Sequence, residues 1–378
     1  MFKSYVENKF KADGLFNKTI TMCDCKLTIA SNNKEAIDYF ENLYYPRDFM
    51  NINGGKYKNI AVYNVCIDIT ELQKLKEELI KEEYKIGECH PHWESVYNIY
   101  LIKGYKIYTE MYDTIDSNAH IIAVNDNSIY IFTSKGLYDY KILSRLIREF
   151  EVRKRENDGY VVFHASLVEN KGKGVMIVGN SGAGKSTMAL TLCKYYGFNY
   201  ISNDRIMVNI HENGTISAVP VIFPIRINYG SLITLGVEEK FSEWKLKLPK
   251  PNEDSDWKNY NGDKKLSILP KELEKYLNIK LSSETNLVAV LFPELVKDDD
   301  LIDVREEGKL DILKNNCYSP NDPHFIEDWL GKRSISNESI QNNANSIING
   351  LSNLMNLSVN YTFDRYMDIC QKIFENIV

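Results

Sequence analysis

Residues 179–187, which read GNSGAGKST, have the types and the spacing of a phosphate-binding loop. The stretch matches the pattern GxxxxGK[ST], whose fixed positions are here Gly179, Gly184, Lys185 and Ser186. An apolar run, GVMIV, comes directly before the loop, and apolar residues at helical spacing follow it. This order of strand, loop and helix predicts that the loop binds the phosphates of a nucleotide.

Each part of this loop has a physical role in such a site. Small residues let consecutive backbone N–H groups curl around phosphate oxygens, and the N-terminus of the following helix adds roughly half a positive charge. Lys185 is expected to reach the β- and γ-phosphates, and the Ser186 hydroxyl to bind Mg²⁺. The expected cofactors are ATP, or another nucleoside triphosphate, and Mg²⁺, and the expected contacts are Gly179, Asn180, Ser181, Gly182, Ala183, Gly184, Lys185, Ser186 and Thr187.

Two side chains outside the loop are candidates for catalysis. Asp204 follows the strand-like run NYIS, and a carboxylate at the carboxyl end of a strand can bind Mg²⁺ or orient a nucleophile. His164 lies in VVFHASLV, one strand before the loop, where it could relay a proton or donate a hydrogen bond. A turn-capping aspartate and a core histidine are the structural alternatives for these two residues.

The elements that would position these residues follow the pattern of an α/β core. We expect strands at residues 161–168 and 174–178, a helix from the loop to residue 196 and a strand at 199–202. Later we expect a strand at 286–292 that Pro293 ends, a helix at 339–354, a short strand at 358–362 and a final helix. Residues 245–265 contain prolines and many charges without periodicity, which predicts a long loop.

The first part of the chain has a mixed α and β pattern. We expect a helix around residues 36–44, a strand at 61–69, a polar helix at 71–85, and a hairpin whose strands, 120–124 and 128–132, join across residues 125–127. Apolar residues between 142 and 150 share one helical face, and the charged run EVRKREND after them indicates a helix end and a boundary. The predicted domains are an α+β accessory domain at 1–157 and a P-loop catalytic domain at 158–378.

Composition restricts the class of protein. Of 378 residues, 44% are hydrophobic and 26% are charged, which is typical of a soluble globular protein. A net charge of −6 disfavours nucleic acid as a partner, and the absence of a long apolar run disfavours a membrane. The seven cysteines are odd in number and scattered, without the spacing of a metal site, which favours reduced thiols and a cytoplasmic location.

Three short stretches together resemble a known family. HAS from His164, GNSGAGKST from Gly179 and SNDR from Ser202 are similar to motifs of the catalytic domain of the bacterial HPr kinase/phosphorylase family. The resemblance extends over about residues 160–378. It implies an HPr-kinase-like α/β P-loop core that uses ATP or pyrophosphate with Mg²⁺ and a serine hydroxyl as phosphoryl acceptor.

The resemblance transfers residue by residue, with one departure. Lys185, Ser186 and His164 match the family's motifs directly. The family has a pair of aspartates where this chain has Asn203, in the first and base-like place, and Asp204 in the second. Because asparagine cannot accept a proton as a carboxylate does, either Asp204 or His164 does that work, or the chain has lost kinase activity.

Two further stretches resemble the kinase-like relatives of this family. They are AVPVIFPIRI, with Arg226, and GDKKLSILP, with Lys264 and Lys265. Such cations could clamp the transferring phosphoryl group or the acceptor, although solvated lysines are equally ordinary. The candidate phosphate or acceptor contacts are therefore Asn203, Arg205, Arg226, Lys264 and Lys265.

The acceptor is less constrained than the donor. The first domain does not resemble the usual N-terminal domain of HPr kinases, so a peptide, another protein or a small-molecule hydroxyl could be the acceptor. Relatives phosphorylate serines in ribosomally made precursor peptides, and the accessory domain could bind such a peptide by strand addition. The resemblance also makes a homo-oligomer an expectation.

Three classes of function fit these observations. The leading one is a serine-directed kinase. The second is a P-loop ATPase or nucleotide switch without a transfer acceptor, although the LSGGQ and NKxD motifs of transporter ATPases and small GTPases are absent from the sequence. The third is a nucleotide-binding pseudokinase, in which the nucleotide stabilises the fold.

Overall fold

The computed structural model describes residues 2–9, 14–45, 58–81, 85–92, 95–110, 120–134, 139–250, 265–297 and 301–377. The chain divides into two compact units. The first consists of Met1–Glu41, Asp48–Lys154 and Asn321–Ser334, and the second of Asn42–Arg47, Arg155–Pro320 and Ile335–Val378. The domain bounds expected from the sequence, 1–157 and 158–378, stay a prediction.

The first unit contains an eight-stranded mixed sheet with the order β1-β2-β3-β8-β7-β6-β5-β4. The strands are β1 (Phe16–Met22), β2 (Cys25–Ser31), β3 (Lys58–Ile67), β4 (Lys85–His92), β5 (Ser95–Ile102), β6 (Tyr105–Glu110), β7 (His120–Val124) and β8 (Ser128–Ser134). β3 pairs in parallel with both β2 and β8. The helices of this part of the sequence are α1 (Phe2–Lys9), α2 (Lys34–Tyr44), α3 (Ile69–Lys81) and α4 (Asp139–Asn157).

The sequence predicts about half of these elements, namely α2, β3, α3, β7, β8 and α4. The expected hairpin is present, because β7 pairs with β8 in antiparallel register. Its turn is closed by the Asn125 side chain, whose Oδ1 accepts hydrogen bonds from the backbone N–H groups of Asn127 and Ser128. The expected helix at 71–85 begins two residues earlier, at Ile69, and is described as far as Lys81.

The charged run near residue 150 belongs largely to α4, which ends within it at Asn157. Charge alone suggests a solvated surface there, but Arg153 and Glu149 are fully buried. The Arg153 Nε donates to the Glu149 carboxylate at 2.7 Å, and its NH2 group donates to the Phe325 carbonyl at 2.8 Å. Burial raises the pKa of Glu149, and the Arg153 guanidinium opposes that shift.

The second unit contains a nine-stranded sheet. Seven of its strands lie in the order β12-β10-β11-β17-β14-β13-β9, while β19 also pairs with β17 and β18 pairs with β19. Its strands are β9 (Val161–Phe163), β10 (Ala165–Asn170), β11 (Lys173–Val178), β12 (Asn199–Ser202), β13 (Ile206–Ile210), β14 (Ile216–Pro220), β17 (Thr285–Leu295), β18 (Asp303–Glu306) and β19 (Met355–Tyr361). A separate ribbon pairs β15 (Ile225–Ile227) with β16 (Leu266–Ile268).

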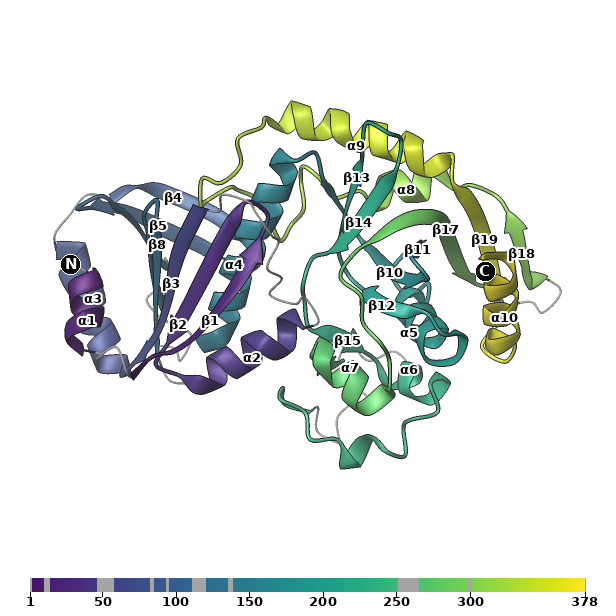
Figure 1. Ribbon diagram of the computed structural model, residues 1–378, viewed down its shortest axis with the longest axis horizontal. Helices are drawn as coiled ribbons and strands as arrows, with labels where there is room; N and C mark the ends of the chain where they lie inside the picture. Colours follow the sequence, from purple (N-terminus) through teal and green to yellow (C-terminus); the bar gives the residue numbers. More distant parts are fainter. Residues whose placement is uncertain are drawn as a thin grey trace. The chain divides into compact units, whose positions relative to one another are not determined.

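Helices cover both faces of this sheet (Figure 1). They are α5 (Lys185–Tyr196), α6 (Tyr229–Thr234), α7 (Pro270–Leu277), α8 (Leu310–Asn316), α9 (Asn337–Ser352) and α10 (Tyr366–Ile377). Successive side chains of a strand point to opposite faces. Val175 and Ile177 of β11 accordingly pack with apolar residues of α5 and α10, whereas Met176 and Val178 pack with those of α8 and α9. The α/β class expected from the sequence is confirmed.

Two details of the second unit correct the sequence interpretation. The strand expected over 161–168 is divided at His164, whose backbone N–H donates to the Asn316 carbonyl at 2.8 Å, so β9 pairs with β13 while β10 pairs with β11 and β12. Pro293 does not end β17, which continues to Leu295. The Pro293 carbonyl faces Gly179, beyond the end of β11, so the missing N–H of proline interrupts no bond to that neighbour.

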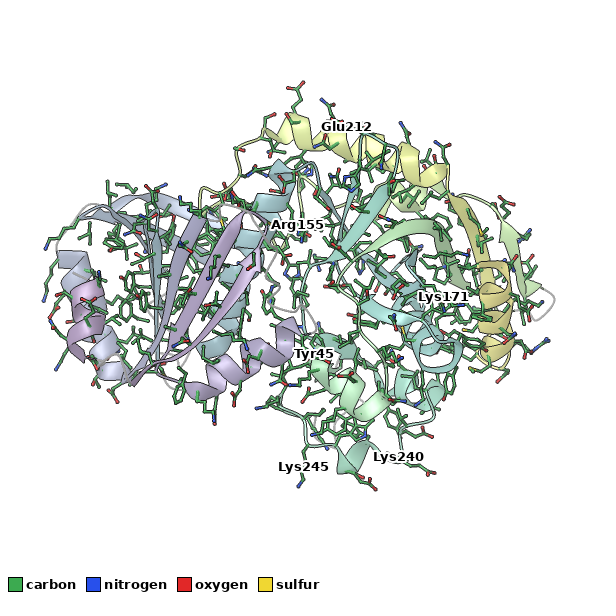
Figure 2. All side chains as sticks on the ribbon, in the orientation of Figure 1. Tyr45, Arg155, Lys171, Glu212, Lys240 and Lys245 are labelled. Atoms are coloured by element: carbon green, nitrogen blue, oxygen red, sulfur yellow. The ribbon has the colours of Figure 1, made fainter. Side chains whose placement is uncertain are left out.

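The expected strand, loop and helix occur in order as β11, residues 179–184 and α5. Figure 2 labels Lys171, which lies in the turn between β10 and β11, at the end of these strands opposite the loop. The expected C-terminal helix, strand and helix are present as α9, β19 and α10. Of the loop expected at 245–265, residues 245–250 contain no helix or strand, and 251–264 lie outside the described residues. In the described part of the chain, no helix is long and apolar enough to span a membrane.

Two glycines give the phosphate loop its curl. Gly182 and Gly184 have φ angles of 81° and 82°, in the left-handed region that favours glycine. A side chain at Gly182 would meet no atom within 4 Å, whereas a Cβ at Gly184 would overlap the hydroxyl of Tyr361, the last residue of β19. The Tyr361 hydroxyl donates to the Ala183 carbonyl at 3.1 Å and so holds the loop against the sheet.

We predict that Gly184→Ala destabilises the second unit more than Gly182→Ala does. Left-handed strain should cost each variant about 1–2 kcal/mol. The overlap with Tyr361 should cost Gly184→Ala a further ~1–3 kcal/mol. Urea unfolding measures both losses, and adding Tyr361→Phe should recover part of the loss in Gly184→Ala only. Equal losses for the two single variants would contradict this packing.

A second prediction concerns the buried pair in α4. Arg153→Leu leaves the Glu149 carboxylate buried without its cation, and we expect it to lower the free energy of unfolding by about 3–5 kcal/mol. The control is Lys74→Leu, at an exposed position of α3, which should change it by less than about 0.5 kcal/mol. A loss below ~1 kcal/mol for Arg153→Leu would show that the pair contributes little.

Candidate functional site

The strand directions of the second unit bring three segments together at one end of the strands of its sheet. β10 is antiparallel to both β11 and β12, so β11 and β12 run in the same direction and end on the same side. Gly179 follows the end of β11, Asn203 follows the end of β12, and His164 precedes the start of β10. The phosphate loop, Asp204 and His164 therefore lie at the same end of these strands, as expected for a site at the carboxyl ends of parallel strands.

Lys185 begins α5 and points back into the loop. Its ammonium group donates to the carbonyl oxygens of Gly179, at 2.7 Å, and Asn180, at 3.1 Å, and the residue is buried. Burial lowers its pKa to about 8, against the opposing effect of Asp204 and with a smaller lowering by the cation of Lys265. A phosphate anion entering the loop would favour the charged form of this lysine and compete with the carbonyls for it.

The hydroxyl of Ser186 lies against Asn203. It donates to the Asn203 carbonyl at 3.4 Å, and the Asn203 side-chain amide donates to it at 3.3 Å. The Ser166 hydroxyl also donates to the Asn203 carbonyl, at 3.3 Å. Next in sequence, the Thr187 hydroxyl lies 2.7 Å from the Ser231 hydroxyl of α6. Asn203 stands where the HPr kinase/phosphorylase family has the first aspartate of its pair. An amide, rather than a carboxylate, therefore lies beside the Ser186 hydroxyl.

Asp204 lies between a histidine and an arginine. Its Oδ1 lies 3.6 Å from the His164 Nε2, and its Oδ2 accepts a hydrogen bond from the Arg205 NH1 at 2.6 Å. The Asp204 side chain keeps 42% of its surface exposed, while that of Arg205 keeps 6%. The carboxylate is therefore oriented by its neighbours and still accessible to a substrate.

Two aromatic residues, Tyr318 and Phe223, contact the neighbours of Asp204. The Arg205 guanidinium carbon lies 5.2 Å from the centre of the Tyr318 ring and 5.8 Å from that of Phe223. The Tyr318 hydroxyl lies 3.1 Å from the His164 Nδ1, and the two rings are stacked. Arg205 is thus held within the fold by its contacts with Asp204 and the aromatic rings, instead of being extended into solvent to reach a phosphate.

The remaining candidate cations lie on the β15–β16 ribbon. Arg226 is in β15 and exposed, and Lys265 directly precedes β16 and is exposed. The positive charge of Lys265 contributes to the lowered pKa of Lys185. Lys264 lies outside the described residues.

Sequence reasoning missed several residues that the structure brings to the site. Tyr318 is 154 positions from His164, and Tyr361 is 178 positions from Ala183. Neither tyrosine belongs to a motif or stands at a recognisable spacing from one. Ser166 does stand inside the HAS stretch, so its closeness to the site could have been inferred from that motif.

The oxygen-bearing side chains at this end of the strands fit a hard divalent cation. Mg²⁺ prefers oxygen ligands and commonly uses one or two carboxylates together with waters and substrate phosphates. The Ser186 hydroxyl and the accessible Asp204 carboxylate offer such donors beside the loop. Asn203 adds a neutral side chain rather than a second negative charge.

Comparisons with known proteins agree with the motifs. An HPr kinase/phosphorylase of Pediococcus pentosaceus is 33% identical over 123 residues, covering 29% of this chain and 38% of that protein. One of Prosthecochloris aestuarii is 44% identical over 50 residues, covering 13% of this chain and 14% of that protein. This chain thus spans less than half the length of these curated relatives.

The structural comparison gives a distant similarity. The Hpr(Ser) kinase/phosphatase of Coxiella burnetii matches with a TM-score of 0.27 and 12% identity, covering 57% of this chain and 95% of that chain. No protein-family model matches the chain. The resemblance expected from the motifs is confirmed by the two curated relatives, and part of this chain is HPr-kinase-like in sequence.

Proposed function

We propose that this chain is an ATP- and Mg²⁺-dependent phosphotransferase whose acceptor is a serine hydroxyl of a peptide or protein. The observation that carries the proposal is the position of Asp204: an accessible carboxylate at the edge of the phosphate loop, held between His164 and Arg205. A carboxylate oriented in this way can accept the proton of an attacking hydroxyl group. The kinase/phosphorylase relatives support the same class of reaction.

The loop supplies the donor side of the reaction. Its backbone N–H groups and the N-terminus of α5 would surround the phosphates, and Lys185 would move from the Gly179 and Asn180 carbonyls to the β- and γ-phosphates. The Ser186 hydroxyl would hold Mg²⁺, which when bound neutralises charge on the phosphates. Positioning and charge neutralisation are the main protein contributions to phosphoryl transfer.

On the acceptor side, Asp204 would act as the general base. The serine hydroxyl oxygen forms a bond to the γ-phosphorus as the bond between that phosphorus and the β,γ-bridging oxygen breaks. The hydroxyl proton passes to the Asp204 carboxylate, and ADP leaves. His164 and Arg205 keep the carboxylate oriented, and this fixed geometry replaces the solvent reorganisation that the step would need in water.

The exposed cations of the ribbon fit a role at the transferring group. Lys265 acts electrostatically on Lys185 in the absence of nucleotide, so the two positive charges repel each other. A triphosphate between them would remove that repulsion. We propose that Lys265 and Arg226 contact the γ-phosphoryl group or the acceptor, while Arg205 stays with Asp204 as an orienting group.

Asn203 favours a second candidate, a P-loop ATPase or a pseudokinase. Its amide, beside Ser186, supplies neither the negative charge nor the proton acceptor of an aspartate. In that case the nucleotide would be hydrolysed without an acceptor, or bound without turnover. Asp204 retains a carboxylate next to the loop, which argues against the pseudokinase, and the kinase/phosphorylase relatives support transfer over hydrolysis.

The first unit offers a surface that could recognise the acceptor. The relatives are named for HPr, a protein substrate of those enzymes. For this chain we propose a serine-bearing peptide or protein, recognised by the first unit through strand addition. Among its described strands, β1 and β4 are the outer members of the eight-stranded sheet and offer such an edge.

A transfer assay tests the proposed reaction. Purified protein, Mg²⁺-ATP and a panel of serine-bearing peptides are analysed by mass spectrometry for a phosphoryl-sized gain. Lys185→Ala should lower the rate at least about 100-fold through lost charge stabilisation. Asp204→Asn should lower it by ~100- to 10,000-fold through loss of the base. Lys173→Ala, exposed at the opposite end of β11, should leave the rate unchanged.

The outcomes of this assay separate the candidates. A phosphopeptide that disappears in both active-site variants establishes transfer. ATP consumption without any labelled peptide would instead favour the hydrolase, and binding without consumption would favour the pseudokinase.

The lowered pKa of Lys185 gives a prediction about pH. Below pH 8 the lysine is already charged in the free protein, so nucleotide affinity should be constant; above pH 8 it must first gain a proton, and affinity should fall. At pH 8.5 binding should take up roughly 0.5–0.8 proton, measured by calorimetry in buffers of different ionisation enthalpy. Lys185→Arg should show no such uptake, because guanidinium stays charged. Uptake that persists in Lys185→Arg would assign it to another group.

A further inference from the structure

Tyr318 contacts both side chains that flank Asp204. Its hydroxyl lies 3.1 Å from the His164 Nδ1, and its ring is stacked on the imidazole with centres 5.4 Å apart and planes at 22°. The Arg205 guanidinium carbon lies 5.2 Å from the centre of the same ring. Since His164 and Arg205 each contact one oxygen of the Asp204 carboxylate, Tyr318 closes a ring of four side chains.

The backbone holds Tyr318 in this place. The Tyr318 N–H donates to the Val162 carbonyl at 2.8 Å, and the Ser319 hydroxyl accepts a hydrogen bond from the Val162 N–H at 2.8 Å. A bridge also joins Cys317 to Phe163. The segment after α8 is therefore paired with β9, directly before His164. This pairing fixes where the tyrosine hydroxyl points.

The contacts of the imidazole determine which nitrogen carries the proton. The Nε2 faces a carboxylate oxygen, which accepts but cannot donate, so a neutral His164 is stabilised with its proton on Nε2. The Nδ1 is then an acceptor, and the group beside it must donate. The Tyr318 hydroxyl is such a donor.

We propose that Tyr318 is a positioning residue, which donates to the His164 Nδ1 and fixes this imidazole as the Nε2–H tautomer facing Asp204. The proposal rests on the proposed function, in which Asp204 is the base. With the opposite tautomer, a nitrogen lone pair would face the carboxylate and repel it from its position. Tyr318 keeps its own proton throughout, and the acceptor proton passes to Asp204 alone.

In this arrangement His164 and Asp204 have different roles. An imidazole whose Nε2–H faces the Asp204 Oδ1, 3.6 Å away, stabilises the carboxylate electrostatically, whereas its acceptor nitrogen is occupied by Tyr318 and is turned away from Asp204. His164 is then an orienting group rather than the proton acceptor for the serine hydroxyl. The alternative left open by the sequence, a histidine base in place of Asn203, is thereby disfavoured.

Nitrogen NMR of histidine-labelled protein tests the tautomer without any assay of activity. The chain has six histidines, and the His164 signals are assigned by their loss in His164→Gln. At a pH where the imidazole is neutral, the wild type should show a protonated Nε2 and an unprotonated Nδ1. Tyr318→Phe keeps the ring but removes the hydroxyl, and it should shift His164 toward a mixture of the two tautomers.

The matched control is Tyr160→Phe. Tyr160 is also in the second unit, its hydroxyl lies 3.2 Å from the Ser217 hydroxyl, and the Arg155 guanidinium lies over its ring. This variant should leave the His164 signals unchanged. A wild type with the proton on Nδ1, or a Tyr318→Phe spectrum equal to that of the wild type, would overturn the proposal.

Kinetics of the transfer provide the second readout. Loss of one neutral hydrogen bond, worth about 0.5–1.5 kcal/mol, should lower kcat of Tyr318→Phe by roughly 2- to 12-fold. KM for ATP should stay the same, because the hydroxyl contacts His164 and not the loop. An unchanged kcat, or a change in KM alone, would contradict the positioning role. If no acceptor is ever phosphorylated while the tautomer is as expected, the proposed function fails and the assignment of the hydrogen bond stands.

Discussion

The Asp204 carboxylate is held by different partners on its two oxygens, and the chemistry of the site depends on that constraint. Arg205 donates to one oxygen at 2.6 Å, and His164 lies 3.6 Å from the other. Each partner is in turn fixed by Tyr318, through a hydrogen bond or through its ring face. A carboxylate restrained in this way, and still partly exposed, can receive a proton from a substrate without first reorganising.

The sheet explains how these residues reach one place. The antiparallel strand β10 lies between β11 and β12 and makes those two strands end on the same side. β17 is parallel to β11, and β19 is parallel to β17, so β19 ends on the same side as β11. Its last residue, Tyr361, contacts the loop there. Apolar residues on both faces of these strands pack beneath the helices, so the polar site sits at the ends of well-packed strands.

Local sequence predicts the parts of this site that are close in the chain. The loop, α5 and the position of Asp204 after β12 follow from a run of about 25 residues whose pattern alternates between strand and helix periodicity. His164 was correctly placed before the loop strand, but the break of the backbone there depends on Asn316, which no periodicity reveals. The tyrosines that contact the site come from more than 150 residues away. The buried Arg153–Glu149 pair was equally hidden, because a charged run normally indicates a solvated surface.

A crystal structure with Mg²⁺ and a non-hydrolysable ATP analogue tests the central claim most directly. The account predicts the β- and γ-phosphates within residues 179–187, with the Lys185 ammonium group moved from the Gly179 carbonyl to these phosphates. It also predicts that the Asp204 carboxylate faces the γ-phosphate with room for a hydroxyl between them. An analogue bound away from the loop, or a γ-phosphate that faces away from Asp204, would contradict it.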